Sequence, residues 1–201
     1  MDGPSEPERS RDLVQRATGG DQAAVELLLA EHLSRLRAFL RLRMGAVVRS
    51  KESTEDLVQS VCREALERLD GFEYRGEASF RHWLFRQAEH KVIDRGRFYR
   101  RGKRDAEREI ALEAQGHESE TLRGLESLFT PSRDAVAHEE LARLEQAFGK
   151  LPPDYQEVIL LARVVELPHA KIAERMGRTV SATWTLLSRA LARLSTHLDP
   201  G

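Results

Sequence analysis

The chain has 201 residues, with 32 Lys and Arg against 33 Asp and Glu and a single cysteine. This length fits one ordinary domain or two small ones. One cysteine excludes an internal disulfide framework and a multi-cysteine zinc site, and it is typical of a reducing compartment, so we expect a cytoplasmic protein. We expect no membrane insertion, because no apolar run approaches the ~20 residues of a membrane span. The first residues, MDGPSEPERSRD, also lack the apolar core of a signal peptide.

The formal net charge of −1 conceals blocks of opposite sign. Residues 86–104 hold 8 basic and 2 acidic side chains, whereas residues 105–140 hold 3 basic and 10 acidic ones. Such a division indicates either a surface that faces nucleic acid beside an acidic linker, or simply solvated faces. Charge alone does not separate these two interpretations.

Apolar residues recur with helical spacing, and no stretch alternates as a strand would, so the sequence predicts an all-α fold. Asp21 is expected to cap a helix that runs to about Met44. Ser53 and Asp56 have capping-box spacing at the start of a second helix, which Gly71 is expected to end. A third helix is expected to begin near residue 79, and the three helices can share one core.

The helical pattern is interrupted by an acidic stretch that is poor in aromatic residues, which is typical of a linker with at most short helices. We therefore predict two small helical domains, at residues 15–102 and 138–198. The linker between them spans residues 103–137, and a disordered N-terminal tail spans residues 1–14.

The second domain is expected to contain a helix-turn-helix unit. Asp154 is placed to cap one helix, and Pro168 suits the first turn of the short helix that follows. Gly177 is expected to end that helix, and Thr179 to cap the last one, from Val180 to Leu198. The residues expected to pack these two helices together are Ile172, Ala173, Met176, Val180, Thr183 and Leu187.

Basic and aromatic side chains are interleaved along the third helix and its basic end. Arginine contacts phosphates and stacks on planar groups, and aromatic rings stack on unpaired bases, so this pattern suits nucleic acid. The alternative is an amphipathic core helix with buried rings and solvated arginines. In the preceding loop, DGFEYRGEA, Phe72 and Tyr74 form either a base pocket or a cover over the end of the core.

The sequence contains no credible catalytic set, and we expect no enzyme activity, no cofactor and no metal site. The seven histidines are scattered, and none pairs with a carboxylate at metal-ligand spacing. Neither a phosphate-binding glycine loop nor a nucleophile elbow occurs. Cys62 lies on the apolar-leaning side of its helix, so we expect it to fill space in the core.

Two blocks resemble the bacterial extracytoplasmic-function sigma factors of the sigma-70 family. The second conserved region of that family is similar to EDLVQSVCREALERLDGF followed by RGEASFRHWLFRQAEHKVIDRGRFYRR. The fourth is similar to LEQAFGKLPPDYQEVILLARVVELPHAKIAERMGRTVSATWTLLSRALARL. The resemblance implies a non-enzymatic subunit that binds core RNA polymerase, directs it to promoters and melts DNA, under possible control by an anti-sigma factor.

In the first domain, the resemblance implies a helix that docks on the clamp helices of the largest polymerase subunit, and the family also contacts the flap of the second subunit. The implied polymerase-binding residues are Glu55, Asp56, Leu57, Gln59 and Arg63. Residues 71–78 match the loop that captures a base flipped out of the minus-10 element. The implied minus-10 contacts are Phe72, Tyr74, Arg75, Arg81, Trp83, Arg86, His90, Lys91, Arg95 and Arg97.

In the second domain, the resemblance implies that the last helix enters the major groove at the minus-35 element. The implied contacts are Arg178, Thr179, Ser181, Trp184, Thr185, Ser188 and Arg189. Many members of the family have a Gly-Thr-Val-Lys-Ser-Arg run here, whereas this chain has Ser-Ala-Thr-Trp-Thr-Leu at 181–186. Fewer cations mean weaker phosphate attraction. Trp184 could contact thymine methyl groups or sugar edges, or it could be covered by a protein partner.

Two other functions stay open at this level. A helix-turn-helix regulator that acts on duplex DNA without polymerase explains the second domain, but not the third helix or the acidic linker. A helical adaptor that binds only proteins would tolerate alanine at Arg86, Lys91 and Arg95.

Overall fold

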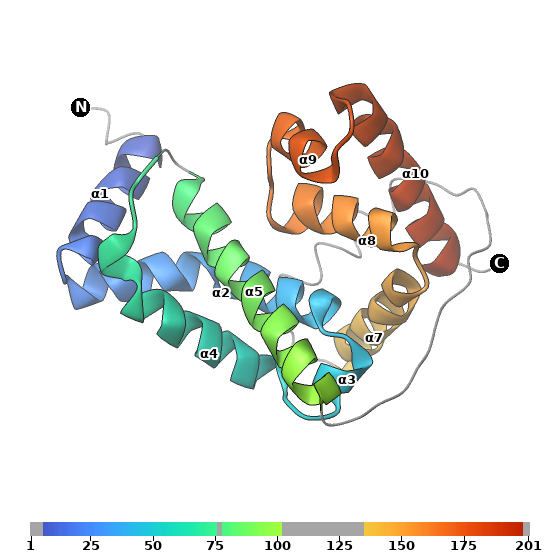
Figure 1. Cartoon of the computed structure of the whole chain (residues 1–201), viewed down its shortest axis with the longest axis horizontal. Coiled ribbons are helices and arrows are strands. Elements are labelled where there is room, and N and C mark those ends of the chain that lie inside the picture. Colours follow the sequence, from blue (N-terminus) through green and yellow to red (C-terminus); the bar gives the residue numbers. More distant parts are fainter. Residues whose placement is uncertain (1–5, 76–77, 102–134, 199–201) are drawn as a thin grey trace. The chain divides into compact units, whose positions relative to one another are not determined.

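The computed structural model describes residues 6–75, 78–101 and 135–198, which form helices joined by short turns (Figure 1). Within these ranges no strand occurs, and the predicted all-α fold class is confirmed. The chain divides into two compact units, Met1–Arg104 and Asp105–Gly201. Most of the expected linker lies outside the described residues. No helix in the described part is long and apolar enough to cross a bilayer.

The first unit contains α1 (Glu6–Thr18), α2 (Gln22–Arg43), α3 (Ala46–Arg49), α4 (Thr54–Glu67), the 3-10 turn η1 (Leu69–Gly71) and α5 (Ser79–Arg101). Helices α2, α4 and α5 each pack against the other two, and α1 packs along α2 (Figure 1). The core between them is apolar, and its buried members include Val25, Leu28, Leu36, Leu40, Leu57, Val61, Phe80, Leu84 and Phe85.

Helix α1 differs from the disordered tail that the sequence predicts for residues 1–14, because the helix begins at Glu6. Val14 and Ala17, three residues apart on α1, are buried, and the helix packs against α2 and η1. Tertiary packing of one apolar face supplies most of the stability of a protein helix. The first twelve residues are mostly charged or polar, and the two apolar residues that pack, Val14 and Ala17, come after them. The composition of the N-terminal stretch therefore suggested a tail.

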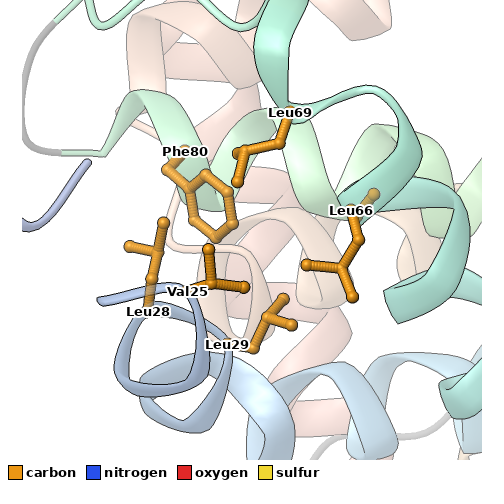
Figure 2. Close-up of a pocket in the computed structure, with 7 residues that line it drawn as sticks. Val25, Leu28, Leu29, Leu66, Leu69 and Phe80 are labelled. Atoms are coloured by element: carbon orange, nitrogen blue, oxygen red, sulfur yellow. The ribbon is translucent and has the colours of Figure 1, made fainter. Parts of the chain in front are cut away.

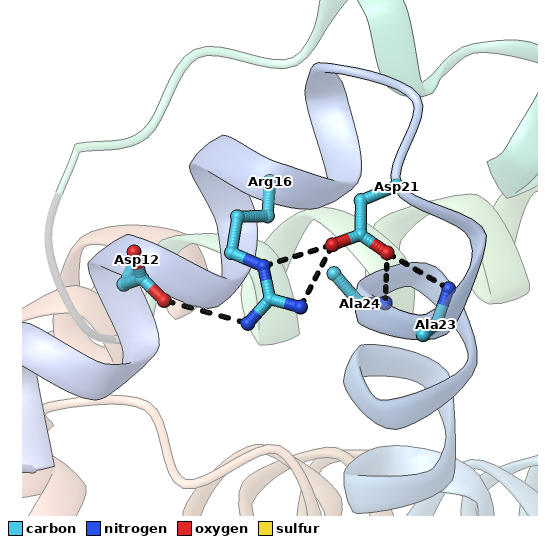
Figure 3. Close-up of polar contacts among 5 residues, drawn as sticks. All are labelled: Asp12, Arg16, Asp21, Ala23 and Ala24. Atoms are coloured by element: carbon cyan, nitrogen blue, oxygen red, sulfur yellow. Dashed lines mark hydrogen bonds and ion pairs between the residues drawn. The ribbon is translucent and has the colours of Figure 1, made fainter.

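The start of α2 is fixed by Asp21, which is its N-cap as predicted. One carboxylate oxygen accepts the backbone N–H groups of Ala23 at 3.0 Å and Ala24 at 3.1 Å (Figure 3). The other accepts two hydrogen bonds from the Arg16 guanidinium, at 2.9 and 2.7 Å, and Arg16 also lies 3.7 Å from Asp12. Hydrogen bonds from Arg16 and then from the backbone hold the pKa of Asp21 below its usual value.

We expect Asp21→Asn to lower the thermal stability of the protein at about pH 7 and to leave it unchanged near pH 2. Because the folded-state pKa is depressed, the ionised carboxylate stabilises the fold above the unfolded pKa of about 4, and this contribution is lost as the pH falls through the folded pKa. Asparagine also caps helices well, so the variant removes the charge and keeps the acceptor. Thermal unfolding followed by circular dichroism across this pH range measures the effect. A difference in Tm that stays constant with pH would contradict it.

The start of α4 is fixed by the predicted capping box, which is confirmed. The Ser53 hydroxyl oxygen accepts the backbone N–H of Asp56 at 3.1 Å, and the Asp56 carboxylate accepts the backbone N–H of Ser53 at 3.1 Å. The Ser53 hydroxyl donates to the same carboxylate at 2.6 Å, and this bond lowers the pKa of Asp56. The first turn of α4 is therefore held in one conformation.

An apolar pocket lies where α2, α4, η1 and the start of α5 meet (Figure 2). Its lining residues are Val25, Leu28, Leu29, Ala65, Leu66, Leu69 and Phe80. Phe80 lies in the first turn of α5 and is buried, so it anchors the start of this helix on the core.

The second unit contains α7 (Ala135–Gly149), α8 (Pro153–Ile159), the π-helical turn η2 (Leu160–Val164), α9 (His169–Met176) and α10 (Val180–Leu198). Helix α10 packs against α7, α8 and α9, and has the bounds that the sequence predicts (Figure 1). The buried core of this unit includes Leu144, Phe148, Val158, Ile159, Ile172, Leu187, Leu191 and Leu194.

Two helix starts in this unit differ from the prediction. Pro152, not Asp154, is the N-cap of α8, and Pro168 is the N-cap of α9 instead of a first-turn residue. A residue that precedes proline is pushed out of the helical region, so Pro153 forces an extended conformation on Pro152 and then starts the helix itself. Val180 also differs from the expected packing set, because 45% of it is exposed.

Candidate nucleic-acid interface

The residues expected to bind polymerase lie on α4, and all but one are at its surface. Glu55, Gln59 and Arg63 are exposed at intervals of four residues, so they share a face. Glu55 also accepts a hydrogen bond of 2.6 Å from Arg37 of α2. Leu57 is 0% exposed. A side chain without exposed surface cannot contact a partner, so the prediction that Leu57 belongs to the docking face is wrong. Its spacing from the other core residues of α4 explains its burial.

The fifth polymerase candidate, Asp56, is exposed but engaged in the capping box with Ser53. Its carboxylate is therefore oriented by its own helix start. Glu55 is paired with Arg37, and Asp56 caps its own helix. Gln59 and Arg63 are the two other exposed side chains of the expected set, and the described part of the structure records neither an ion pair nor a capping role for them.

Three aromatic rings gather where the loop before α5 meets the core. The ring centroid of Phe72 lies 5.3 Å from that of Trp83 and 5.6 Å from that of Phe80, and Phe80 and Trp83 are themselves 5.6 Å apart. Phe80 is buried, whereas Phe72 and Trp83 are half-buried. The cluster thus closes the end of the core through Phe80 and leaves part of two rings open to a ligand. Aromatic rings that are partly exposed can stack on unpaired bases.

Tyr74 and Arg75 continue the loop. The guanidinium of Arg11 lies 5.8 Å from the Tyr74 ring centroid, a cation–π distance. Arg75 lies 2.8 Å from Glu73 in a largely exposed pair, and its backbone N–H donates to the Ser79 hydroxyl at 3.2 Å. Exposed ion pairs are weak in water, so the Arg75 side chain can exchange Glu73 for a phosphate.

One face of α5 presents basic side chains to solvent. Arg86, His90 and Arg97 are exposed, and helical geometry puts them on the same side. Arg97 lies 3.9 Å from Asp94 in an exposed pair. Arg81 is half-buried and does not share this face.

A second set of cations on α5 is held within the protein. Lys91 donates to the Glu64 carboxylate of α4, and Arg95 Nε lies 3.1 Å from a carboxylate oxygen of Glu52, which precedes α4. The Tyr99 hydroxyl donates to the same Glu52 carboxylate at 2.5 Å, which raises the pKa of Tyr99. The side chain of Lys91 is only 14% exposed. These contacts attach α5 to the α4 region, so both cations have structural partners in the free protein.

A polar groove between α4 and α5 is lined by side chains of both sets. Its lining residues are Glu64, Arg68, Gln87, His90, Lys91, Ile93, Asp94 and Arg97. Arg68 donates to the Gln87 side-chain oxygen at 2.7 Å across it. The groove therefore joins the exposed cations to the paired one.

The turn between α9 and α10 has the predicted helix-turn-helix geometry. Gly177 ends α9 in the left-handed conformation, with φ 63°, and the Thr179 hydroxyl accepts the backbone N–H of Ala182 at 3.1 Å. Both predictions are confirmed. Between them, Arg178 donates to Asp154 of α8 at 2.5 Å. The turn is therefore fixed from both sides.

The exposed side of the first turns of α10 carries small hydroxyl side chains, one aromatic ring and one cation. Its exposed candidate residues are Ser181, Trp184, Thr185, Ser188 and Arg189. The Thr185 hydroxyl donates to the Ser181 carbonyl oxygen at 3.1 Å. The ring centroid of Trp184 lies 3.7 Å from that of His169, the first residue of α9.

Sequence reasoning missed the partners of these side chains. Glu52, Glu64 and His169 were not among the expected site residues, although each contacts one of them. A single sequence carries no periodic signal for pairs such as Lys91 and Glu64, which are 27 residues apart and meet only after the helices pack.

Nothing in the described ranges forms a group of three or more metal-ligating side chains. Cys62 is half-buried, and burial raises the pKa of its thiol, which disfavours the reactive thiolate.

Comparisons with known proteins match both units. A family model described as Sigma-70 region 2 matches residues 28–104, and one described as Sigma-70, region 4 matches residues 141–194. The RNA polymerase sigma factor CnrH of Cupriavidus metallidurans is 31% identical over 196 residues, which cover 94% of each chain. The ECF RNA polymerase sigma factor SigD of Mycobacterium tuberculosis is 29% identical over 95% of this chain and 84% of its own length. A solved structure of CnrH in complex with the cytosolic domain of CnrY aligns with a TM-score of 0.57 at 26% identity, and the alignment covers 95% of this chain and 97% of that one.

Proposed function

Because the chain belongs to the sigma-70 family, in its extracytoplasmic-function group, we propose that it is the sigma subunit that brings core RNA polymerase to a set of promoters and opens them. It binds core polymerase and promoter DNA, and its role in initiation is recognition, without catalysis. The observation that carries this proposal is the match of two sigma regions, in order, to the two helical units. We assign it to the cytoplasm, where polymerase works.

We propose a division of roles between residues 15–102 and 138–198. In the first, the exposed Gln59 and Arg63 of α4 dock on the clamp helices. The half-buried rings of Phe72 and Trp83 receive an unstacked base, which offsets the few kcal/mol that unstacking costs.

The outward face of α5, with Arg86, His90 and Arg97, follows the phosphates of the non-template strand. In the second unit, the first turns of α10 enter the major groove at the minus-35 element, as the second helix of a helix-turn-helix does.

We also propose that a protein partner controls this chain. The relative CnrH has been solved with the cytosolic domain of CnrY. A partner of that kind would act as an anti-sigma factor by covering surfaces that polymerase needs.

Reconstitution with core polymerase, followed by run-off transcription from a genomic promoter library, tests the proposal. We expect transcripts that depend on this chain and weak binding of the free chain to duplex DNA. The absence of chain-dependent transcripts would contradict it. Tight, sequence-selective binding of the free chain to duplex DNA would instead favour a regulator that acts without polymerase.

A further inference from the structure

His169 and Trp184 form a close, tilted ring pair that joins the two helices of the helix-turn-helix. Their ring centroids lie 3.7 Å apart with 34° between the planes. Trp184 is nevertheless 51% exposed, so one part of the indole rests on the imidazole and the rest faces solvent. The Nδ1 atom of His169 is buried and has no hydrogen-bond partner in the described part of the chain. The imidazole is therefore held against the indole of Trp184 by ring contact and not by a hydrogen bond through Nδ1.

Two of the cations near the pair are matched by carboxylates, whereas Arg189 is exposed further along α10. Arg178 donates to Asp154, and Lys171 of α9 donates to Glu174 at 2.8 Å. Such pairs are weak in water, but each brings a carboxylate next to the cation. Besides Arg189, this surface offers a large indole bordered by hydroxyl side chains.

The position of Trp184 decides which apolar group it can meet. It is the fifth residue of α10, and the N-terminal residues of a recognition helix contact base edges. The thymine C5-methyl is the apolar group that base pairs present in the major groove. Among the large apolar side chains exposed in the described part of this unit there are only Val180 and Trp184. A protein docking surface generally has a broader apolar core, so this narrow strip favours a base edge.

We propose that Trp184 reads a thymine methyl group in the minus-35 element and that His169 is the positioning residue that holds the indole for this contact. The inference rests on the proposed function, since it requires α10 to enter the major groove. Stacking on His169 limits the rotamers of Trp184 before DNA binds, so less conformational freedom is lost on binding. Loss of this stacking is expected to weaken recognition about two- to tenfold.

Replacement of single thymines by uracil tests the proposal, because it removes only the methyl group. The assay is run-off transcription by the reconstituted holoenzyme, on a promoter that it transcribes, with each minus-35 thymine replaced in turn. For the unmodified protein we expect one position at which uracil lowers the initial rate about fourfold, as burial of one methyl-sized group implies. With Trp184→Ala, thymine and uracil should give equal rates at that position.

His169→Ala is expected to reduce the thymine preference, and His169→Phe, which keeps a stacking ring, is expected to restore it. A merely structural role of the imidazole would not give this rescue. Thermal unfolding of each variant, followed by circular dichroism, checks that the fold is intact. If uracil has no effect at any position, or if Trp184→Ala keeps the thymine preference, the inference is wrong. The second result would assign Trp184 to a protein contact.

A template that is already melted at the minus-10 element and lacks a minus-35 element separates this inference from the proposed function. All variants should transcribe it as the unmodified protein does, because it depends on the first unit. Failure of the unmodified protein on every template would contradict the proposed function, and this inference with it.

Discussion

Leu57→Ala is expected to destabilise the first unit by about 2–5 kcal/mol, whereas Gln59→Ala and Arg63→Ala leave the free energy of unfolding within about 0.5 kcal/mol of the unmodified value. Leu57 is 0% exposed in the core between α2, α4 and α5, so its truncation leaves a cavity. Gln59 and Arg63 are exposed on the same helix. Urea unfolding of the full chain measures the free energy of unfolding of each variant, with the transition of the first unit analysed separately from that of the second.

For binding to core polymerase, we expect the exposed residues of α4, and not Leu57, to make the direct contribution. The double variant Gln59→Ala with Arg63→Ala is expected to bind core polymerase about tenfold more weakly, as truncation of interface anchors commonly does. Gln146→Ala, at an exposed position of α7 in the other unit, is the matched control and should bind normally. Unchanged affinity of the double variant would show that this face of α4 is not the docking surface.

The helical pattern alone assigns Leu57 correctly to the core. Leu57, Val61 and Ala65 recur every four residues and are all buried. The error came from the resemblance to a family, which implies a docking segment and does not say which of its side chains face outward.

Local signals predicted the helix ends well. The caps at Asp21, Ser53, Gly177 and Thr179 are found as expected, because each depends on hydrogen bonds or backbone angles within a few residues. Three other predictions of helix ends were wrong. Pro152 instead of Asp154 caps α8, because Pro153 forces an extended conformation on it. Pro168 is the N-cap of α9 and not a first-turn residue, and α4 ends at Glu67, before the expected Gly71.

Contacts between distant segments were not predictable in this way. Arg95 and Glu52 are far apart in sequence, as are His169 and Trp184, and no spacing rule connects them. Their pairing depends on how the helices pack. The basic block at residues 86–104 therefore looks like one surface in the sequence. Within its described part, however, the structure exposes Arg86 and Arg97 and pairs Lys91 and Arg95 with carboxylates.

Arg86→Ala combined with Arg97→Ala is expected to lower the affinity of the holoenzyme for promoter DNA and leave protein stability nearly unchanged. Both side chains are exposed on the outward face of α5. Each phosphate contact on a single strand contributes about 0.7 to the slope of log K against log salt, so the double variant should lose about 1.4 of that slope. Titration of the holoenzyme with a single-stranded minus-10 oligonucleotide at several salt concentrations measures it.

Lys91→Ala is the matched counterpart on the same helix and is expected to do the reverse. Its partner, Glu64, is 31% exposed and would lose its cation in a half-buried site, so the protein should be destabilised by about 1–3 kcal/mol. The salt slope should not change if Lys91 stays on Glu64 in the complex. A loss of slope equal to that of one exposed arginine would contradict this. It would mean that Lys91 leaves Glu64 when DNA binds, and that the carboxylates of the α4 region compete with the DNA phosphates for the cations of α5.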